Sequence, residues 1–396
     1  MSSDVAIVGA GVTRFGKRDD VSYRELMAEA VVEALKSTNG ELVPENIEGL
    51  FVAAGQPELL VDQAHVGNLA TQVVGIQPKI VSRVEMACSS GSTALRNGWA
   101  AIASGIADTV LLIGLEKMTG DMKVASRGLC LVPDVENEAI HGITAYSGFA
   151  LAAHEHMQKY GTTKEQMSMV AVKNHSNAAK NPKAQFHRMG EITIEKALNS
   201  KIVSEPFNLF DCSPITDGAS AVIITKAENA RKYTDQPIHI LGAGQSIEPS
   251  IGVSNMPSIT EWHALKRAAK TAYEMANVTP KDINLAETHD CFTIAEIIEY
   301  EDLGFTEKGK GGQFIEDGES KIGGSLPVNT SGGLKAKGHP IGATGLAQIT
   351  EITEQLRGLS GARQVADANI GLTHNLSGFA THHVVHILGN QPTNGK

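Results

Sequence analysis

Cys88 is the side chain in this sequence best suited to covalent chemistry. It follows a strand-like run at 79–84 and precedes helical apolar spacing at 94–102, within the segment Met86-Ala87-Cys88-Ser89-Ser90-Gly91. Because the first N–H groups of a helix favour negative charge, we expect this thiol to ionise easily. A thiolate in a turn of small residues can accept an acyl group. The alternative interpretation is an ordinary buried free cysteine.

Three later segments carry further reactive side chains. They are Glu287-Thr288-His289-Asp290-Cys291-Phe292-Thr293, the glycine-rich run 329–345 with Gly338-His339-Pro340-Ile341-Gly342, and His374-Asn375-Leu376-Ser377-Gly378. With the Cys88 segment, and in this order, they resemble the four catalytic signatures of the thiolase superfamily. The His-Asp-Cys-Phe form of the second signature is similar to that of sterol-carrier-protein thiolases and of archaeal mevalonate-pathway thiolases. The resemblance covers essentially the whole chain.

The resemblance implies a role for each of four side chains. Cys88 accepts the acyl group, and His339 activates it and helps hold the thioester oxygen of the attacking acyl-CoA. Cys291 carries the proton, because the segment at 373–378 lacks the cysteine that most thiolases use there. His289 orients a water or polarises the second thioester. The plainer alternatives are a helix-start cap for His339 and a packed thiol for Cys291, and Asp290 is either a partner of His289 or a turn residue.

Acyl transfer also needs backbone N–H groups that face the developing oxyanion. One is expected from Cys88 itself, with His339 serving the other thioester oxygen. The second N–H is expected from the turn Leu376-Ser377-Gly378. Phe379 and Ala380 follow this turn where the family usually has glycines or small residues. Which residue donates therefore stays open at this point.

Coenzyme A is anionic, so its phosphates require local positive charge in a chain of net charge −10. Candidate binding residues are Lys173, Lys183, Arg188 and Ser254, although the basic side chains fit a solvated face equally well. Four histidines also gather near the C-terminus: His374, His382, His383 and His386. A metal site there is conceivable, but alternation along a strand sends neighbouring side chains to opposite faces. We expect no metal and no cofactor, with coenzyme A thioesters as substrates.

Two halves of the chain repeat one plan. Residues 5–11 and 238–244 each fit a buried strand that ends in glycines, and helical patterns follow at 23–35 and 261–276, the second with Thr260 as a plausible N-cap. The resemblance implies the thiolase fold, an α/β protein with two repeated core units in five layers (α/β/α/β/α) and an inserted loop domain. The expected parts are 1–117 with 205–234 (N-terminal core half), 118–204 (loop domain) and 235–396 (C-terminal core half).

Composition narrows the class of protein. The 396 residues include four cysteines without a Cys-x-x-Cys pair, which fits a reducing cytoplasm better than a disulfide framework. No apolar run is long enough for a membrane helix, and the net charge argues against nucleic-acid binding. Gly9-Ala10-Gly11 resembles part of a dinucleotide motif, but Arg14 stands where its third glycine belongs.

The resemblance implies acetyl-CoA C-acetyltransferase activity: two acetyl-CoA condense to acetoacetyl-CoA through acetyl-Cys88, feeding mevalonate and isoprenoid synthesis. The implied partners are a second copy in a homodimer or tetramer, 3-hydroxy-3-methylglutaryl-CoA synthase, and a small OB-fold zinc-ribbon scaffold protein. Two alternatives stay open: a 3-ketoacyl-CoA thiolase for longer or branched chains, and a thiolase-fold scaffold or aldolase subunit.

Overall fold

Nine strands of this chain form one mixed sheet in the computed structural model, which describes residues 5–392. The order across the sheet is β3 (Ile80–Val84), β2 (Gly49–Ala53), β4 (Thr109–Glu116), β7 (Gly218–Lys226), β1 (Val5–Val12), β8 (Ile238–Ile247), β11 (His382–Gly389), β10 (Ile370–Ser377) and β9 (Leu285–Glu287). Strands β1, β4 and β11 are buried along their whole length, as expected for strands covered on both faces.

The strand order contains an internal repeat. In the first half, β2 lies parallel to β3 and β4, while β7 and β1 follow antiparallel. In the second half, β9 lies parallel to β10, and β11 and β8 follow antiparallel. A single parallel bridge from Ala286 to Val328 stands where β3 stands in the first half. The halves meet where β1 pairs with β8, so the repeat predicted from the sequence is confirmed.

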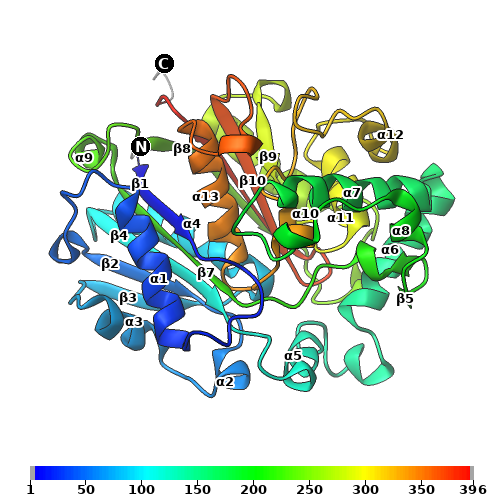
Figure 1. Cartoon of the computed structure of the whole chain (residues 1–396), viewed down its shortest axis with the longest axis horizontal. Coiled ribbons are helices and arrows are strands. Elements are labelled where there is room, and N and C mark those ends of the chain that lie inside the picture. Colours follow the sequence, from blue (N-terminus) through cyan, green and yellow to red (C-terminus); the bar gives the residue numbers. More distant parts are fainter. Residues whose placement is uncertain (1–4, 393–396) are drawn as a thin grey trace.

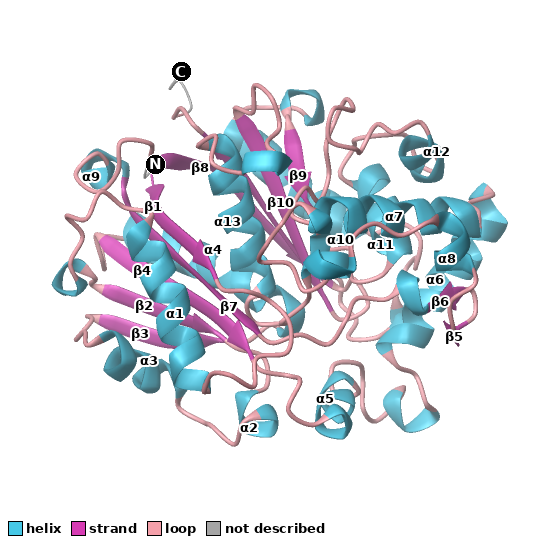
Figure 2. Cartoon of the chain, in the orientation of Figure 1, coloured by secondary structure: helices cyan, strands magenta, loops and turns pink. Residues whose placement is uncertain are grey.

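Helices cover and separate the two halves of the sheet (Figure 1). On the outside, α1 (Tyr23–Lys36) and α3 (Val66–Val74) pack on the first half, and α10 (His263–Ala276) packs on the second. Between the halves, α4 (Ser90–Ala103) contacts β2, β4 and β11, and α13 (Thr344–Leu356) contacts β7, β9 and β10. Figure 2 shows these helices beside the strands. This is the five-layer thiolase arrangement.

The stretch expected to form the loop domain, 118–204, is mostly helical. It contains α5 (Met122–Leu129), α6 (Ala145–Tyr160), α7 (Lys164–Ala179) and α8 (Ile194–Leu198). Gly161 ends α6 in the left-handed conformation, and Thr163 and Gln166 form a capping box on α7. The remaining elements are α2 (Pro57–Leu60), α9 (Ala227–Ala230), α11 (Thr293–Asp302), α12 (Gly311–Glu316), β5 (Ile202–Ser204) and β6 (Phe207–Asn208).

One predicted helix start is wrong. Helix α10 begins at His263 after Trp262, and Thr260 does not cap it. The Trp262 N–H donates instead to the Asp302 carboxylate at 2.7 Å, and the Thr260 hydroxyl donates to Glu155. A partner distant in sequence therefore replaces the local cap. Within residues 5–392, none of the helices has the length and apolar character needed to cross a bilayer.

The two central helices touch through glycines at their N-termini. A Cβ built on Gly91 of α4 would lie 2.8 Å from the Leu346 amide nitrogen, and one on Gly345 of α13 would lie 2.3 Å from that of Ser92. Real Cβ atoms do not approach backbone this closely. The contact brings the segments that begin these helices, which carry Cys88 and His339, to the same place.

We predict that Gly345→Ala lowers the free energy of unfolding by about 1–3 kcal/mol, because the added methyl forces the two helix ends apart. It should also reduce the acyl transfer expected at Cys88, because the segments that carry Cys88 and His339 separate. Urea denaturation and a rate assay measure these effects. Gly120→Ala is the matched control, since nothing lies within 4 Å of that site. Equal stability and activity for both variants would contradict the close-contact argument.

Candidate active site

Cys88 lies in a tight turn directly before α4. The turn is the single 3-10 turn Ala87–Ser89, and Ala87 has a φ of 45°, a conformation that non-glycine residues seldom adopt. Two serine hydroxyls hold the turn: Ser89 donates to the Met86 carbonyl at 2.9 Å and Ser90 to the Ala87 carbonyl at 2.6 Å. The turn therefore fixes the direction of the Cys88 side chain.

The four predicted catalytic side chains line one cavity. Its volume is about 70 Å³, and it contains Cys88, His289, Cys291 and His339. The Cys88 sulfur and one ring nitrogen from each histidine lie within 4.8 Å of one another. The remaining lining is mainly apolar: Met118, Leu129, Val132, Ala145, Tyr146, Phe149, Ser213, Pro214, Ile215, Phe292, Ile341, Leu376 and Gly378.

A hydrogen bond to Thr344 sets the tautomer of His339. The Thr344 hydroxyl donates to the Pro340 carbonyl at 3.0 Å, so its oxygen accepts from His339 Nδ1, 2.7 Å away. The proton therefore sits on Nδ1. The lone pair on Nε2 is left free, which is what a general base needs.

His289 has the opposite tautomer. The Asn375 side-chain amide donates to His289 Nδ1 at 2.7 Å, which places the ring proton on Nε2. Within the described residues this Nε2 atom is buried and has no hydrogen-bond partner. The two rings meet edge to face with centroids 5.0 Å apart. His339 thus offers an acceptor and His289 a donor.

Asp290 connects two catalytic segments rather than serving as a partner of His289. Its carboxylate accepts the N–H groups of Leu334 and Lys335 at 2.6 and 3.1 Å. A Cβ on Gly333 would lie 2.3 Å from one carboxylate oxygen, and Gly333 has a φ of +59°. Only glycine fits there. Asp290 therefore fixes the approach of the chain to His339.

Electrostatics at Cys88 contradict the expectation of easy ionisation. Burial, followed by the nearby Glu116 carboxylate, raises the pKa of Cys88 to about 12. Burial also lowers the pKa of His339 to about 3. The low-polarity cavity outweighs the helix N-terminus, since desolvation disfavours both charged forms. The resting pair is a neutral thiol beside a neutral imidazole, and ionisation accompanies attack on the substrate.

We predict that alkylation of Cys88 by iodoacetamide keeps accelerating, roughly tenfold per pH unit, from pH 7 to beyond pH 10. A raised pKa leaves less thiolate at any given pH, so the rate saturates only near pH 12. Mass spectrometry of the Cys88 peptide measures this rate. The same peptide in urea is the control and should level off near the ordinary cysteine pKa of about 8.5. A plateau near pH 8 in the folded protein would restore the helix-terminus explanation.

Three of the four predicted coenzyme A residues are engaged by other parts of the protein. Lys173 is buried, forms an ion pair with Glu296 and donates to the Val328 carbonyl at 2.7 Å, so it cannot offer surface charge. Lys183 pairs with Glu33 at 3.1 Å, and Ser254 donates to Glu138 at 2.6 Å. Arg188 is exposed. Contact of the last three with coenzyme A stays a prediction.

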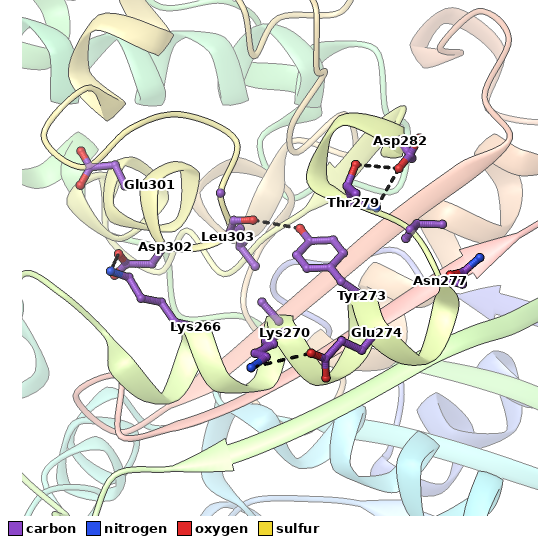
Figure 3. A pocket seen from close by; sticks show the side chains of 13 residues that line it. Lys266, Lys270, Tyr273, Glu274, Asn277, Thr279, Asp282, Glu301, Asp302 and Leu303 are labelled. Atoms are coloured by element: carbon purple, nitrogen blue, oxygen red, sulfur yellow. Dashed lines mark hydrogen bonds and ion pairs between the residues drawn. The ribbon is translucent and has the colours of Figure 1, made fainter.

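An open groove of about 730 Å³ lies elsewhere, between α10 and the end of α11 (Figure 3). Several of its polar side chains are engaged by neighbouring groups. The Tyr273 hydroxyl donates to the Leu303 carbonyl at 3.0 Å, and Lys270 and Lys266 lie 3.7 and 3.6 Å from Glu274 and Asp302. It contains no thiol or imidazole, so the small cavity is the better candidate for chemistry.

Comparison with known proteins identifies the family of this chain. Residues 5–228 match the family "Thiolase, N-terminal domain", and 246–390 match "Thiolase C-terminal domain-like". The chain belongs to the thiolase family of acyltransferases. The acetyl-CoA acetyltransferases of Methanothermobacter thermautotrophicus and Methanocaldococcus jannaschii are 45% and 41% identical, over 97% and 98% of this chain and 99% of each relative. Human sterol carrier protein 2 is 32% identical, over 94% of this chain and 69% of that protein.

Solved structures agree on the fold. The chain described as "Ltp2-ChsH2(DUF35) aldolase" superposes with a TM-score of 0.84 at 29% identity, covering 98% of both chains. Human mitochondrial 3-ketoacyl-CoA thiolase in complex with CoA superposes with a TM-score of 0.75 at 19% identity, again over 98% of both chains. At that identity the second likeness supports the fold alone.

Proposed function

We propose that this protein is an acetyl-CoA C-acetyltransferase, which condenses two acetyl-CoA into acetoacetyl-CoA and coenzyme A. The observation that carries the proposal is that two thiols and two imidazoles in opposite tautomers line one small cavity. Two relatives above 40% identity bear the name acetyl-CoA acetyltransferase. No metal or organic prosthetic group is needed, since the thioester is already activated.

In the first half-reaction, His339 Nε2 takes the Cys88 proton as the sulfur attacks the acetyl-CoA carbonyl. The N–H groups of Cys88 and of the Leu376–Gly378 turn stabilise the oxyanion. We assign the second donor to Gly378, which lines both this cavity and the neighbouring groove, whereas Ser377 lines the groove and not the cavity. Collapse expels the coenzyme A thiolate, which takes the proton back from His339. Acetyl-Cys88 is left.

In the second half-reaction, Cys291 passes its proton to His339 in the same step in which it takes one from the methyl group of a second acetyl-CoA. Burial raises the pKa of the Cys291 thiol well above its usual value, so its thiolate is a strong base for a carbon-bound proton. His289 Nε2–H and protonated His339 stabilise the enolate oxygen. The enolate attacks acetyl-Cys88, and the released Cys88 sulfur takes the proton from His339.

Cavity size favours a two-carbon acyl group over a longer chain. A volume of about 70 Å³ is far below the roughly 300–1,000 Å³ of sites that enclose whole drug-sized ligands. Phe149 lines the cavity, stacks on Phe292 at 4.8 Å and packs near Phe379 at 6.2 Å. Behind Phe149 and Phe379 lies a second space of only about 10 Å³. These rings leave little room for further methylene groups.

This proposal includes a role in mevalonate synthesis and assembly as a homodimer or tetramer. It also includes two partners, 3-hydroxy-3-methylglutaryl-CoA synthase and a small OB-fold zinc-ribbon protein. The solved structure described as "Ltp2-ChsH2(DUF35) aldolase" has this fold and names a DUF35 protein as well. This supports a search for an accessory protein that binds the present chain. That relative is also titled an aldolase. Cys88, His289, Cys291 and His339 together favour Claisen chemistry over that alternative here.

We predict that brief incubation with acetyl-CoA adds one acetyl group to the protein, seen by intact-mass spectrometry. The Cys88→Ala variant should show no adduct, because it lacks the attacking sulfur, while Cys130→Ala should behave as the wild type. The absence of an adduct on folded wild-type protein would contradict the acetyltransferase assignment. An adduct that persists in Cys88→Ala would place the nucleophile elsewhere.

We predict that Phe149→Val raises the kcat/KM for a longer substrate, 3-ketohexanoyl-CoA, relative to acetoacetyl-CoA by about tenfold, as expected for a pocket enlarged by one or two methylenes. Phe207→Val is the matched control. Phe207 stacks on Phe292 at 5.3 Å, so it loses similar packing, but it does not line the cavity. The same selectivity change in both variants, or in neither, would show that Phe149 does not limit chain length.

A further inference from the structure

We propose that His382 and His383, adjacent residues at the start of β11, are positioning residues that hold the two sides of the oxyanion hole. The inference rests on the proposed function, which supplies the hole. The sequence marked these histidines only as conceivable metal ligands. Their hydrogen bonds instead lead to the two segments that carry the N–H donors, Cys88 and Gly378.

His382 holds the turn that carries Cys88, the proposed nucleophile. Its Nδ1 lies 2.7 Å from the Ser89 hydroxyl, which already donates to the Met86 carbonyl. Ser89 must therefore accept the bond, so His382 carries its proton on Nδ1. The Gln245 amide donates to the other nitrogen, Nε2, at 2.8 Å. Ser89 directly follows Cys88, so this bond fixes the turn from which the Cys88 N–H points.

His383 holds the turn that contains Gly378 and Ala380. Its Nε2 donates to the Ala380 carbonyl at 2.7 Å. Ala380 has a φ of +58° and Gly378 one of +63°, so the turn contains two left-handed residues, one of which bears a side chain. Such a conformation costs about 1–2 kcal/mol and persists only where the surroundings determine it. The hydrogen bond from His383 is one such determinant.

A buried chain of donors sets the tautomer of His383. Its Nδ1 accepts from His374 Nε2 at 2.9 Å. The other nitrogen of His374, Nδ1, lies 3.2 Å from the Glu299 carboxyl group. Burial raises the pKa of Glu299 well above its usual value and lowers that of His374 to about 3, so both are neutral. His374 and His383 then donate in one direction, toward Ala380.

The strand makes the arrangement possible. Adjacent side chains on β11 point to opposite faces of the sheet. His382 therefore reaches the central layer, where α4 begins, and His383 lies on the α10 side, with its ring 5.7 Å from that of Trp262. One dipeptide thus fixes both donor segments relative to a single rigid strand. The separation of the two N–H groups depends on β11.

The test is the infrared carbonyl band of acetyl-Cys88 formed from 13C-labelled acetyl-CoA, since stronger hydrogen bonds to the carbonyl lower its frequency. His382→Leu and His383→Leu should raise the frequency and slow acetylation about 10- to 100-fold, with little change in KM. His382→Asn keeps a donor near Nδ1 and His383→Gln keeps one near Nε2, so each should restore most of the effect. A merely structural role would not move the band or give this rescue.

The control is His386→Leu, on the same strand. His386 is buried, and within residues 5–392 neither ring nitrogen has a hydrogen-bond partner, so its removal should leave the band unchanged. If the acetyl adduct forms and its carbonyl frequency is the same in His382→Leu and His383→Leu as in the wild type, this inference alone is overturned. No adduct on the wild type would overturn the proposed function and this inference with it.

Should the leucine variants not fold, 15N-histidine NMR of the wild-type protein decides the question. The account requires the proton on Nδ1 of His382 and on Nε2 of His383. The reverse tautomer at either residue would overturn the inference, because the donated hydrogen bond would not exist.

Discussion

The active site depends on how closely two helix N-termini can approach each other. Helices α4 and α13 belong to different halves of the chain, and their backbones come into close contact at Gly91 and Gly345, beside the Asn375 side chain. Each helix is preceded by a turn that carries a candidate catalytic residue, Cys88 in one case and His339 in the other. A methyl group at this contact would separate the turns, so the chemistry depends on the packing of two glycines.

Burial is the second constraint, and it explains the protonation states. A cavity lined by apolar and aromatic groups disfavours every charge, so the thiols hold their protons and the histidines remain neutral. A neutral imidazole can donate or accept a proton at a given nitrogen only if hydrogen bonds fix its tautomer, and the surrounding residues supply these bonds. Thr344 sets His339 as an acceptor and Asn375 sets His289 as a donor. The site is therefore poised for proton transfer rather than permanently ionised.

The repeat and the meeting of Cys88, His289, Cys291 and His339 at one cavity could be predicted from the sequence, and the five layers were implied by the family resemblance. The glycine-ended strands at 5–11 and 238–244 and the four short segments are local patterns, and local patterns survive folding. Other features could not be read because they depend on residues far apart. Trp262 takes its N-terminal partner from Asp302, Asp290 binds the chain before His339, and Lys173 pairs with Glu296 inside the protein. The high pKa of Cys88 also depends on burial, which the turn itself does not reveal.

The most direct test of the account is to follow two acetyl groups separately. Unlabelled acetyl-enzyme would be isolated and mixed with 13C-labelled acetyl-CoA, and the acetoacetyl-CoA formed in one turnover analysed by NMR. The account predicts label only in the acetyl unit still joined to coenzyme A, and none in the unit transferred from Cys88. Label in both units, or release of the enzyme-bound acetyl group without carbon–carbon bond formation, would contradict it.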